Sequence, residues 1–361
     1  MTRLNLQRKI MFQKSLIAII ICLLAISAIA CQNQNKNRYE AQFLKLFDTV
    51  TQVVSYMEKK EVFENQVKAI YDDLEKYHRY YDIYKEYDGI KNIRSINQMA
   101  GKQPVKVDRP IINLLLYGKE IYKMTHGEVN IALGAVLSIW HEYRDTGILN
   151  PEQAQLPSDN MLKEAAKHTD INKIIINEKK STVFLDDGYM SIDVGAIAKG
   201  YALAQVTKKA IERGFTSGLI SVGGNVSIIG EKDLMGTPWN VGIQNPEIDE
   251  GDNRNIFVLA LKDCSLVTSG NYRRYYTVNG KKYHHIIDPD TLYPAQYFSS
   301  VSVIDNHSGQ ADGLSTAIYN MPLDQGLELI ENLPDTEAFW LLPDGERRFS
   351  SGFQKYLKKE K

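Results

Sequence analysis

Three polar segments that lie far apart in the sequence constrain the fold of this chain more than any other feature. They are residues 193–200 (DVGAIAKG), 284–289 (HHIIDP) and 312–316 (DGLST). Each sets charged or hydroxyl side chains beside small residues or a turn-forming proline, the composition that brings polar groups and bare backbone close to a phosphate or a metal. The sequence therefore predicts a fold that gathers three distant segments at one metal and phosphate site.

The start of the chain has the features of an export signal. Basic residues without an acid precede an apolar run over 16–30, and small residues stand directly before Cys31. This order is typical of a secretory signal, and the run is shorter than the roughly 20 residues that a spanning helix prefers. It is similar to a bacterial lipobox, in which Cys31 would be lipidated and become the mature N-terminus. An uncleaved anchor is the alternative, because Ala28 stands where lipoboxes usually carry leucine.

Both alternatives place the body of the protein outside the cytoplasmic membrane. We predict a lipoprotein signal peptide over residues 1–30, a polar tether over 31–37 and one domain over 38–361. The expected location is the extracytoplasmic face of the cell membrane, with a lipid anchor.

Cysteine content and charge exclude two classes of protein. The mature domain would keep Cys264 as its one cysteine, so no disulfide framework can form within the chain. A composition that is 43% hydrophobic is ordinary for a domain held by its own core. The formal net charge of −1 lacks the basic excess of a nucleic-acid-binding surface, so we expect no nucleic-acid partner.

Hydrophobic periodicity predicts strands and helices that alternate along the chain. The turn signals are Gly223-Gly224-Asn225, Asn279-Gly280 and Pro343-Asp344-Gly345, and residues 147–159 are predicted to be a loop. The predicted helices are 60–86, one from Pro110 to before Gly127, 195–213, 310–319 and 324–332; the predicted strands are 42–57 with a central turn, 173–176, 182–185, 190–193, 217–229 and 301–304. This order indicates a single intermixed α+β domain with mixed or antiparallel sheets and flanking helices.

Residues 193–200 have the composition of a strand-to-helix phosphate site. Gly195 and Gly200 would let backbone approach a ligand, and a following helix would offer unpaired N–H groups to an anion. Lys199 adds a mobile positive charge suited to a phosphate or a carboxylate. The alternative is an ordinary strand-to-helix turn with a surface lysine.

Residues 312–316 have the spacing of a cation site. Residues four apart share a helix face, so Asp312 and Thr316 can point at one hard cation together with main-chain carbonyls. Magnesium takes few protein ligands and completes its octahedron with phosphate oxygens and water. The alternative is that Asp312 caps the helix while Thr316 packs against it or bonds back to it.

Residues 284–289 carry two adjacent histidines after a hairpin. Adjacent strand residues face opposite ways, so one histidine at most can face a given cleft. A histidine near its ordinary pKa of about 6.5 can take a proton from an alcohol. The alternative is a histidine pair on an edge strand in solvent, and metal binding by the pair is disfavoured because the rings diverge.

Taken together, these segments resemble the ApbE family of flavin transferases, which move the FMN half of FAD onto a Ser or Thr of another protein. Further segments match in the same order, so that the resemblance runs through most of the mature chain. They are Phe47-Asp48-Thr49, Ser95-Ile96-Asn97, Val222-Gly223-Gly224-Asn225 and Thr268-Ser269-Gly270-Asn271-Tyr272-Arg273.

The resemblance implies a T-fold-like α+β domain that uses Mg²⁺, takes FAD as substrate and transfers FMN to a Ser or Thr hydroxyl of an extracytoplasmic acceptor protein, releasing AMP. It implies His285 as the base, because the family pattern is a histidine directly before Ile-Ile-Asp-Pro. The implied magnesium ligands are Asp312, Thr316 and the carbonyl of Ala196. The implied FAD-binding residues are Asp193, Gly195, Lys199, Gly224, Thr268, Ser269 and Gly270.

The chain departs from the family pattern at two positions. Asn130 stands where the family commonly has a carboxylate, and Leu292 follows Thr291 where the family has glycine. These departures affect loop shape and not the proposed metal or base positions. Three other functions stay open: an FAD pyrophosphatase that uses water as nucleophile, a non-catalytic flavin-binding lipoprotein, and a structural surface lipoprotein, which the convergent polar segments disfavour.

Overall fold

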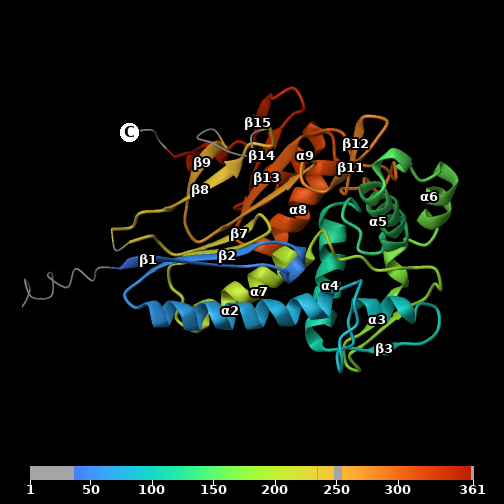
Figure 1. The fold of residues 1–361 in the computed structure, drawn as a ribbon, viewed down its shortest axis with the longest axis horizontal. Coiled ribbons are helices and arrows are strands. Elements are labelled where there is room, and N and C mark those ends of the chain that lie inside the picture. The colour runs from blue at the N-terminus through green and yellow to red at the C-terminus, as the bar shows by residue number, and fades with distance from the viewer. Residues whose placement is uncertain (1–35, 234, 248–253, 359–361) are drawn as a thin grey trace, which may run out of the picture.

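An eight-stranded antiparallel sheet forms the centre of the structure, a computed structural model that describes residues 36–233, 235–247 and 254–358 (Figure 1). Two of its strands, Ser300–Asp305 and Glu337–Leu341, are buried along their whole length because both faces of the sheet are covered there. In spatial order the strands are β1 (Asn37–Phe43), β2 (Thr51–Met57), β6 (Gly218–Val222), β7 (Asn225–Ile229), β10 (Ser265–Gly270), β13 (Ser300–Asp305), β14 (Glu337–Leu341) and β15 (Arg347–Phe349).

Helices cover one face of this sheet and a hairpin covers the other. The first face packs against α7 (Ala198–Glu212) and α8 (Ser308–Asn320), with α2 (Lys60–Tyr81) outside α7, α4 (Arg109–Met124) beside α8 and α9 (Leu323–Glu331) near β14. The second face carries β8 (Trp239–Gln244) and β9 (Asn255–Leu261) over an apolar cluster that includes Leu266, Ile304 and Phe339. Alternation along the strands therefore sends neighbouring side chains into two separate cores.

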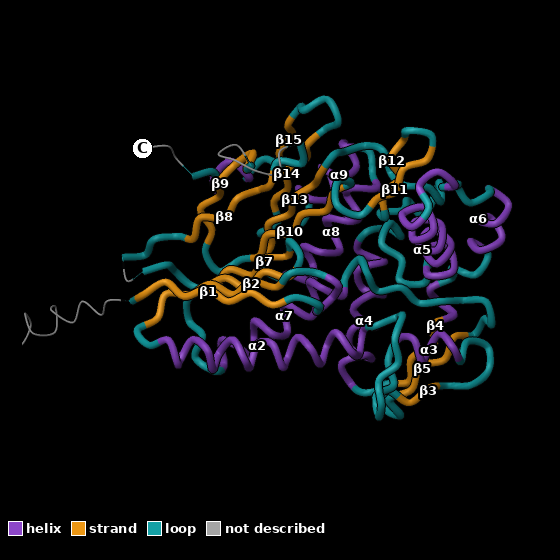
Figure 2. The backbone as a smooth tube through the Cα atoms, in the orientation of Figure 1, coloured by secondary structure: helices purple, strands orange, loops and turns teal. Residues whose placement is uncertain are grey.

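Two smaller units stand beside the central sheet (Figure 2). One is a three-stranded sheet of β3 (Val105–Lys106), β5 (Thr182–Leu185) and β4 (Ile174–Asn177), next to α3 (Ile93–Gln98). The other is the hairpin of β11 (Tyr275–Val278) and β12 (Lys281–His284), which packs on α5 (Gly134–Leu149) near α6 (Asp159–Ala166). Asn279 and Gly280 have φ of 50° and 78°, so the predicted two-residue turn between these strands is confirmed.

The α+β class is confirmed, and every strand ladder in the described ranges is antiparallel. Some boundaries were wrong. The first helix ends at Tyr81 and not at 86, because Asp82 is extended and its Oδ1 accepts the amides of Tyr84 and Lys85 at 2.7 and 3.0 Å. Strand β1 begins at Asn37, inside the predicted tether and five residues before the predicted start at 42.

Two further expectations differ from the structure. The predicted loop over 147–159 includes the last residues of α5, and Asp159 begins α6. The predicted strand over 190–193 is only a single parallel bridge between Ser191 and Leu133.

The predicted signal peptide and Cys31 lie outside the described residues. Within the ranges that the structure describes, none of the helices combines the length and the apolar character needed to cross a membrane.

Candidate active site

Helices α7 and α8 meet at Gly200, which joins two of the three polar segments. A Cβ at this position would lie 2.4 Å from the Ser308 carbonyl oxygen and 2.5 Å from the Asp312 Cβ. The glycine therefore allows close helix packing, which is a different role from the predicted ligand approach. The main-chain N–H of Gly200 donates to Asp312 Oδ2 at 2.8 Å, so Asp312 satisfies an amide in the first turn of the neighbouring helix.

This contact takes up one of the amides that helix 195–213 was expected to offer to an anion. The helix begins at Ala198, three residues after Gly195. The Ala198 amide donates to the Val194 carbonyl at 2.8 Å, and the Gly200 amide is held by Asp312. Two of the first three amides of α7, those of Ala198 and Gly200, are therefore already paired.

Replacing Gly200 by alanine is expected to lower the free energy of unfolding by about 1–3 kcal/mol, the usual cost of overpacking. The measurement is equilibrium unfolding in urea. Gly188→Ala is the matched control, because its added Cβ would meet only the Ala100 oxygen at 4.0 Å. Equal stability of the two variants would contradict the close contact.

Asp312 is where the first and third polar segments touch, and it is 3% exposed. Lys199 Nζ lies 3.5 Å from Asp312 Oδ1, and the lysine side chain keeps a 21% exposed fraction. Thr316 lies one turn further along α8, and its hydroxyl donates to the Asp312 carbonyl at 3.3 Å. Thr316 therefore bonds back to its own helix, as the alternative interpretation of this segment expected, and the cation site stays a prediction. Lys199 is the cation already beside the Asp312 carboxylate.

Asp193 and Gly195 form a tight turn before α7. The Gly195 amide donates to Asp193 Oδ1 at 2.7 Å, and the Asp193 amide donates to the Ile131 carbonyl at 2.9 Å. A Cβ at Gly195 would meet only Asp193 Oδ1, at 3.0 Å, within 4 Å. Gly195 is therefore exposed and its neighbour Ala196 half-buried, in contrast to the buried and crowded Gly200.

Strand β10 places Ser269 and Thr268 on opposite faces of the sheet. Ser269 Oγ bonds to Ser315 Oγ on α8 at 2.8 Å, whereas Thr268 Oγ1 bonds to Ser302 Oγ on β13 at 2.8 Å. Of these two side chains, only that of Ser269 faces α8, the helix that carries Asp312. A Cβ at Gly270 would lie 2.4 Å from the Tyr272 ring, so this glycine makes room for an aromatic side chain.

The turn between β6 and β7 consists of Gly223 and Gly224, whose φ values are 58° and 96°. A Cβ at Gly224 would meet no atom within 4 Å, so this residue lines open space. The next residue, Asn225, is 2% exposed, and its Nδ2 has no partner among the described residues. A buried donor without a partner is costly unless a ligand or water accepts from it.

The two histidines have different surroundings. His284 is buried, its Nε2 donates to the Ala295 carbonyl at 2.6 Å, and its Nδ1 accepts the Ile286 amide at 3.2 Å. His285 is half-buried, and its Nδ1 lies 3.2 Å from the Arg274 carbonyl. A carbonyl only accepts, so Nδ1 of His285 carries the proton and Nε2 keeps its lone pair. The geometry therefore makes His284 structural and leaves His285 with a basic nitrogen.

Burial, and next the positive charge of Arg274, lower the pKa of His285 to about 3. The charges of Lys199 and Arg144 act in the same direction. Because Lys199 also lies beside Asp312, it joins the histidine to the two helical segments. All three segments predicted from the sequence thus belong to one electrostatic neighbourhood.

Sequence reasoning missed two residues of this neighbourhood. His141 on α5 lies with its Nδ1 3.0 Å from the Tyr84 hydroxyl. Burial lowers the pKa of His141, while the charge of Asp193 opposes this; burial and the same aspartate raise the pKa of Tyr84 to about 12. The signal in the sequence was a tyrosine near the end of the predicted helix 60–86 and a histidine beside Trp140, in a segment for which no helix was predicted.

The structure explains both departures from the family pattern. Asn130 Nδ2 donates to the Thr169 carbonyl at 2.9 Å while its Oδ1 accepts the Ala132 amide at 2.8 Å. A carboxylate could not make the first bond, so the amide fits its surroundings. Leu292 has φ of 63°, the left-handed region that favours glycine. Its side chain packs against the apolar cluster around Trp140, which compensates for the backbone strain.

A polar cavity of about 380 Å³ borders this region, lined among others by Glu128, Asn130, Pro289 and Asp290. Burial, and next the charges of Asp288 and Asp290, raise the pKa of Glu128 from 4.5 to about 7. Its Oε2 has no partner among the residues described. An acid with a raised pKa destabilises the folded state as the pH rises above its unfolded pKa, and the full cost is reached above pH 7.

Glu128→Gln is therefore expected to stabilise the protein by about 1–2 kcal/mol at pH 8, a figure reduced for partial solvent exposure, and to have little effect near pH 4.5. Unfolding in urea at both pH values measures this. Glu152→Gln, at an exposed glutamate, is the control. The same stability change at both pH values would argue against the raised pKa.

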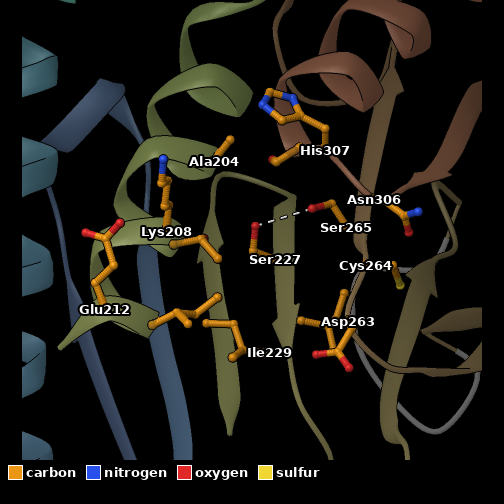
Figure 3. A pocket seen from close by; sticks show the side chains of 14 residues that line it. Ala204, Lys208, Glu212, Ser227, Ile229, Asp263, Cys264, Ser265, Asn306 and His307 are labelled. Atoms are coloured by element: carbon orange, nitrogen blue, oxygen red, sulfur yellow. Dashed lines mark hydrogen bonds between the residues drawn. The ribbon is translucent and has the colours of Figure 1, made fainter. Parts of the chain in front are cut away.

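A second cavity of about 320 Å³ lies between α7, β7 and the start of α8 (Figure 3). Lys208, Glu212, His307 and the thiol-bearing Cys264 line it, and a Ser227–Ser265 hydroxyl pair at 3.3 Å crosses its floor (Figure 3). It contains no residue predicted for the FAD or metal site. It is a separate hollow on the same helical face of the sheet.

Comparison with known proteins agrees with this geometry. Residues 47–340 match the model of the ApbE family. A relative named FAD:protein FMN transferase from Treponema pallidum is 32% identical over 273 residues, which cover 72% of this chain and 73% of the relative. A relative of the same name from Haemophilus influenzae is 27% identical over 330 residues, covering 88% of this chain and 90% of the relative. The crystal structure of the ApbE protein from Thermotoga maritima is 28% identical, with a TM-score of 0.78 over 90% of this chain and 100% of that chain. This chain belongs to the ApbE family.

Proposed function

We propose that this protein is an enzyme that transfers FMN from FAD to a Ser or Thr hydroxyl of an acceptor protein. The main observation behind the proposal is the hydrogen bond from His285 Nδ1 to the Arg274 carbonyl. This bond leaves Nε2 of the same ring with its lone pair, so that it can accept a proton. The curated relatives named FAD:protein FMN transferase support the same activity. In the reaction, the acceptor oxygen bonds to the FMN-side phosphorus, the bond from that phosphorus to the AMP phosphate breaks, and AMP leaves.

His285 would take the hydroxyl proton as the new P–O bond forms. Its depressed pKa keeps the ring neutral at physiological pH, which leaves Nε2 unprotonated, although the same shift makes the ring a weaker base than a free histidine. His284 is unsuited to this role, because both of its ring nitrogens are already bonded. The lower end of the rate gain from such a base is about a hundredfold.

The oxygen donors near Asp312 fit magnesium. Asp312 supplies one carboxylate, Thr316 a hydroxyl on the same helix face, and Ala196 a carbonyl in the accessible turn before α7. No group of three or more His, Cys, Asp or Glu side chains in the described ranges is placed to hold a metal, so phosphate oxygens and water would complete the octahedron. When bound there, magnesium would neutralise the pyrophosphate and stabilise negative charge on the leaving AMP.

The remaining contacts to FAD are assigned from accessibility and charge. Lys199 is the cation at the site and would bind phosphate once released from Asp312. The unpartnered Nδ2 of Asn225, beside the open turn at Gly224, would donate to a substrate oxygen. Ser269, Asp193 and Gly195 stay predicted contacts, whereas the Thr268 side chain points to the other face of the sheet.

Mass spectrometry tests the proposal. The purified protein is incubated with FAD, magnesium and a candidate acceptor, and the acceptor is weighed before and after. Transfer is supported if the acceptor gains the mass of FMN less one water and the added group is located on a Ser or Thr. Consumption of FAD with an unmodified acceptor would indicate the pyrophosphatase activity, in which water replaces the acceptor hydroxyl.

We also propose that the enzyme is anchored by a lipid on Cys31 at the extracytoplasmic face of the membrane, on the strength of the signal and lipobox-like pattern. Cys31→Ala should release the protein from membranes or leave the precursor uncut, because a diacylglyceryl group supplies two acyl chains and thus a stable anchor. Membrane fractionation measures this. Unchanged processing and retention would favour an uncleaved N-terminal helix.

A further inference from the structure

A basic hairpin projects beside the proposed base. We use this name for residues 273–285, which comprise β11, the Asn279-Gly280 turn, β12 and His285. It carries two arginines at its foot and two lysines at its tip, all four exposed: Arg273, Arg274, Lys281 and Lys282. Residues 264–287 contain no acidic residue. The hairpin is therefore a concentrated positive surface in a chain whose formal net charge is −1.

The hairpin is held firmly against α5. Tyr283 stacks on Trp140 with ring centroids 6.3 Å apart and planes inclined by 20°. The Tyr276 hydroxyl donates to the Gln155 carbonyl at 3.1 Å. With these two aromatic anchors and a tight turn, the lysines at the tip keep a fixed position relative to His285 at the foot.

The contacts that these four cations make inside the described structure are to uncharged groups; Arg273, for example, donates to Gln244 Oε1. Across the ranges that the structure describes, none of them forms an ion pair, although sixteen such pairs occur elsewhere. Lys282 lies over the Tyr275 ring with Nζ 4.5 Å from its centroid, and Lys281 lies 5.4 Å from the Tyr283 centroid. Four positive charges on one short hairpin produce a positive potential that attracts an anionic partner.

We propose that the basic hairpin docks an acidic segment of the acceptor protein beside its target hydroxyl, an inference that rests on the proposed transferase function. His285 lies four residue steps after Lys281, which is about 13 Å at the usual rise per residue of a strand. An extended acceptor chain covers that distance in about four residues. The acidic side chains are therefore expected about four residues from the hydroxyl that receives FMN.

A membrane surface is the less suitable partner for this hairpin. Strand β1, which follows the proposed lipid-bearing Cys31, lies toward the opposite end of the molecule's long axis from β11 and β12 (Figure 1). An anchor at that end would hold the hairpin away from the bilayer. The hairpin also adjoins the histidine that must meet the acceptor, which favours a protein partner.

The test uses the full-length enzyme and two peptides with one target threonine each. One peptide carries two aspartates four and five residues from the threonine, and the other has asparagines there. The variant is Lys281→Glu/Lys282→Glu. The matched control is Lys179→Glu/Lys180→Glu, because these lysines are also exposed and adjacent, between the strands of the β4–β5 hairpin. The measurements are peptide binding by fluorescence anisotropy, kcat/KM for transfer, and FAD affinity.

The wild type and the control are expected to bind the aspartate peptide, and to transfer to it, about tenfold better than the asparagine peptide, and to lose this preference in 0.5 M salt. The tip variant should lose the preference while its FAD affinity is unchanged. An equal preference in the tip variant, or none in the wild type, would overturn the proposal.

Binding is measured apart from chemistry, so selective binding without transfer would count against the proposed function and not against the docking surface. Vesicles with 30% phosphatidylglycerol that bind the wild type but not the tip variant, with no peptide preference, would assign the hairpin to the membrane instead.

Discussion

Asp312→Asn is expected to give a folded protein whose FMN transfer is slower by about 10²–10³-fold, the usual cost of removing one preorganised electrostatic contact at a reacting phosphate. Asparagine is preferred to alanine because Asp312 Oδ2 accepts the Gly200 amide, and an amide oxygen can still do so. The carboxylate charge is lost while the contact between α7 and α8 is kept. Transfer rates over a range of magnesium concentrations are the measurement, with the concentration needed for half-maximal rate expected to rise.

Two comparisons separate chemistry from folding for this variant. Thermal unfolding should place Asp312→Asn close to the wild type, whereas Asp312→Ala should be less stable because the Gly200 amide loses its partner. Thr316→Ala should slow transfer less, since a neutral hydroxyl is the weaker ligand. A wild-type rate in Asp312→Asn with an unchanged magnesium requirement would eliminate the proposed metal site.

His285→Ala is expected to bind FAD normally and to transfer FMN at least about a hundredfold more slowly, the lower end for general base catalysis. The His285 ring is half-buried and makes a hydrogen bond to the Arg274 carbonyl, so its loss should cost less stability than the loss of a buried ring bonded at both nitrogens. The matched variant is His284→Ala, which removes a buried ring bonded at both nitrogens and should lose stability. Comparable transfer by His285→Ala and wild type would show that another group takes the proton.

The pH profile of kcat/KM gives an independent readout for this base. A pKa of about 3 in the free enzyme keeps His285 neutral across the range from pH 5 to 8. Activity should therefore not fall with the ordinary histidine pKa as the pH drops from 7.5 to 5.5. A loss of activity centred near pH 6.5, absent from His285→Ala, would mean that this pKa is not depressed.

The polar segments were predictable because their residues have strong local preferences. The Asn-Gly turn, strands β4 and β5, and helices α7 and α8 all follow from spacing and turn residues, apart from the exact helix starts. The convergence of the segments was predicted from their shared chemistry. What the local pattern could not provide is the crowding at Gly200, which exists only because α8 packs across it.

Helix α5 escaped prediction for physical reasons. It begins at Gly134 after a Leu133 N-cap without a side-chain hydrogen bond, and it has no acidic residue in its first turn. Its apolar residues do not form one clear stripe, because it packs on the β11–β12 hairpin and on α6 through different sides. The helix is stabilised by tertiary contacts, which a single sequence does not reveal. His141, and with it the Tyr84 contact, was missed for the same reason.

The sequence could have predicted that the Thr268 and Ser269 side chains point to opposite faces of the sheet. The alternation that separates His284 from His285 applies equally to these neighbours on β10. Ser269 bonds to α8 and Thr268 bonds within the sheet on the other face. A family resemblance assigns both to the substrate wall, whereas the strand geometry allows only one of the two side chains to face the helices.

The most direct test of the proposed reaction is to count the products from one FAD pool in the presence of magnesium and an acceptor protein. Chromatography measures AMP and free FMN, and mass spectrometry measures the acceptor that carries FMN. The transferase proposal predicts that AMP and modified acceptor rise together in equal amounts, with little free FMN, and that both fall together in His285→Ala. AMP matched by free FMN, with an acceptor that gains no mass at any Ser or Thr, would contradict it.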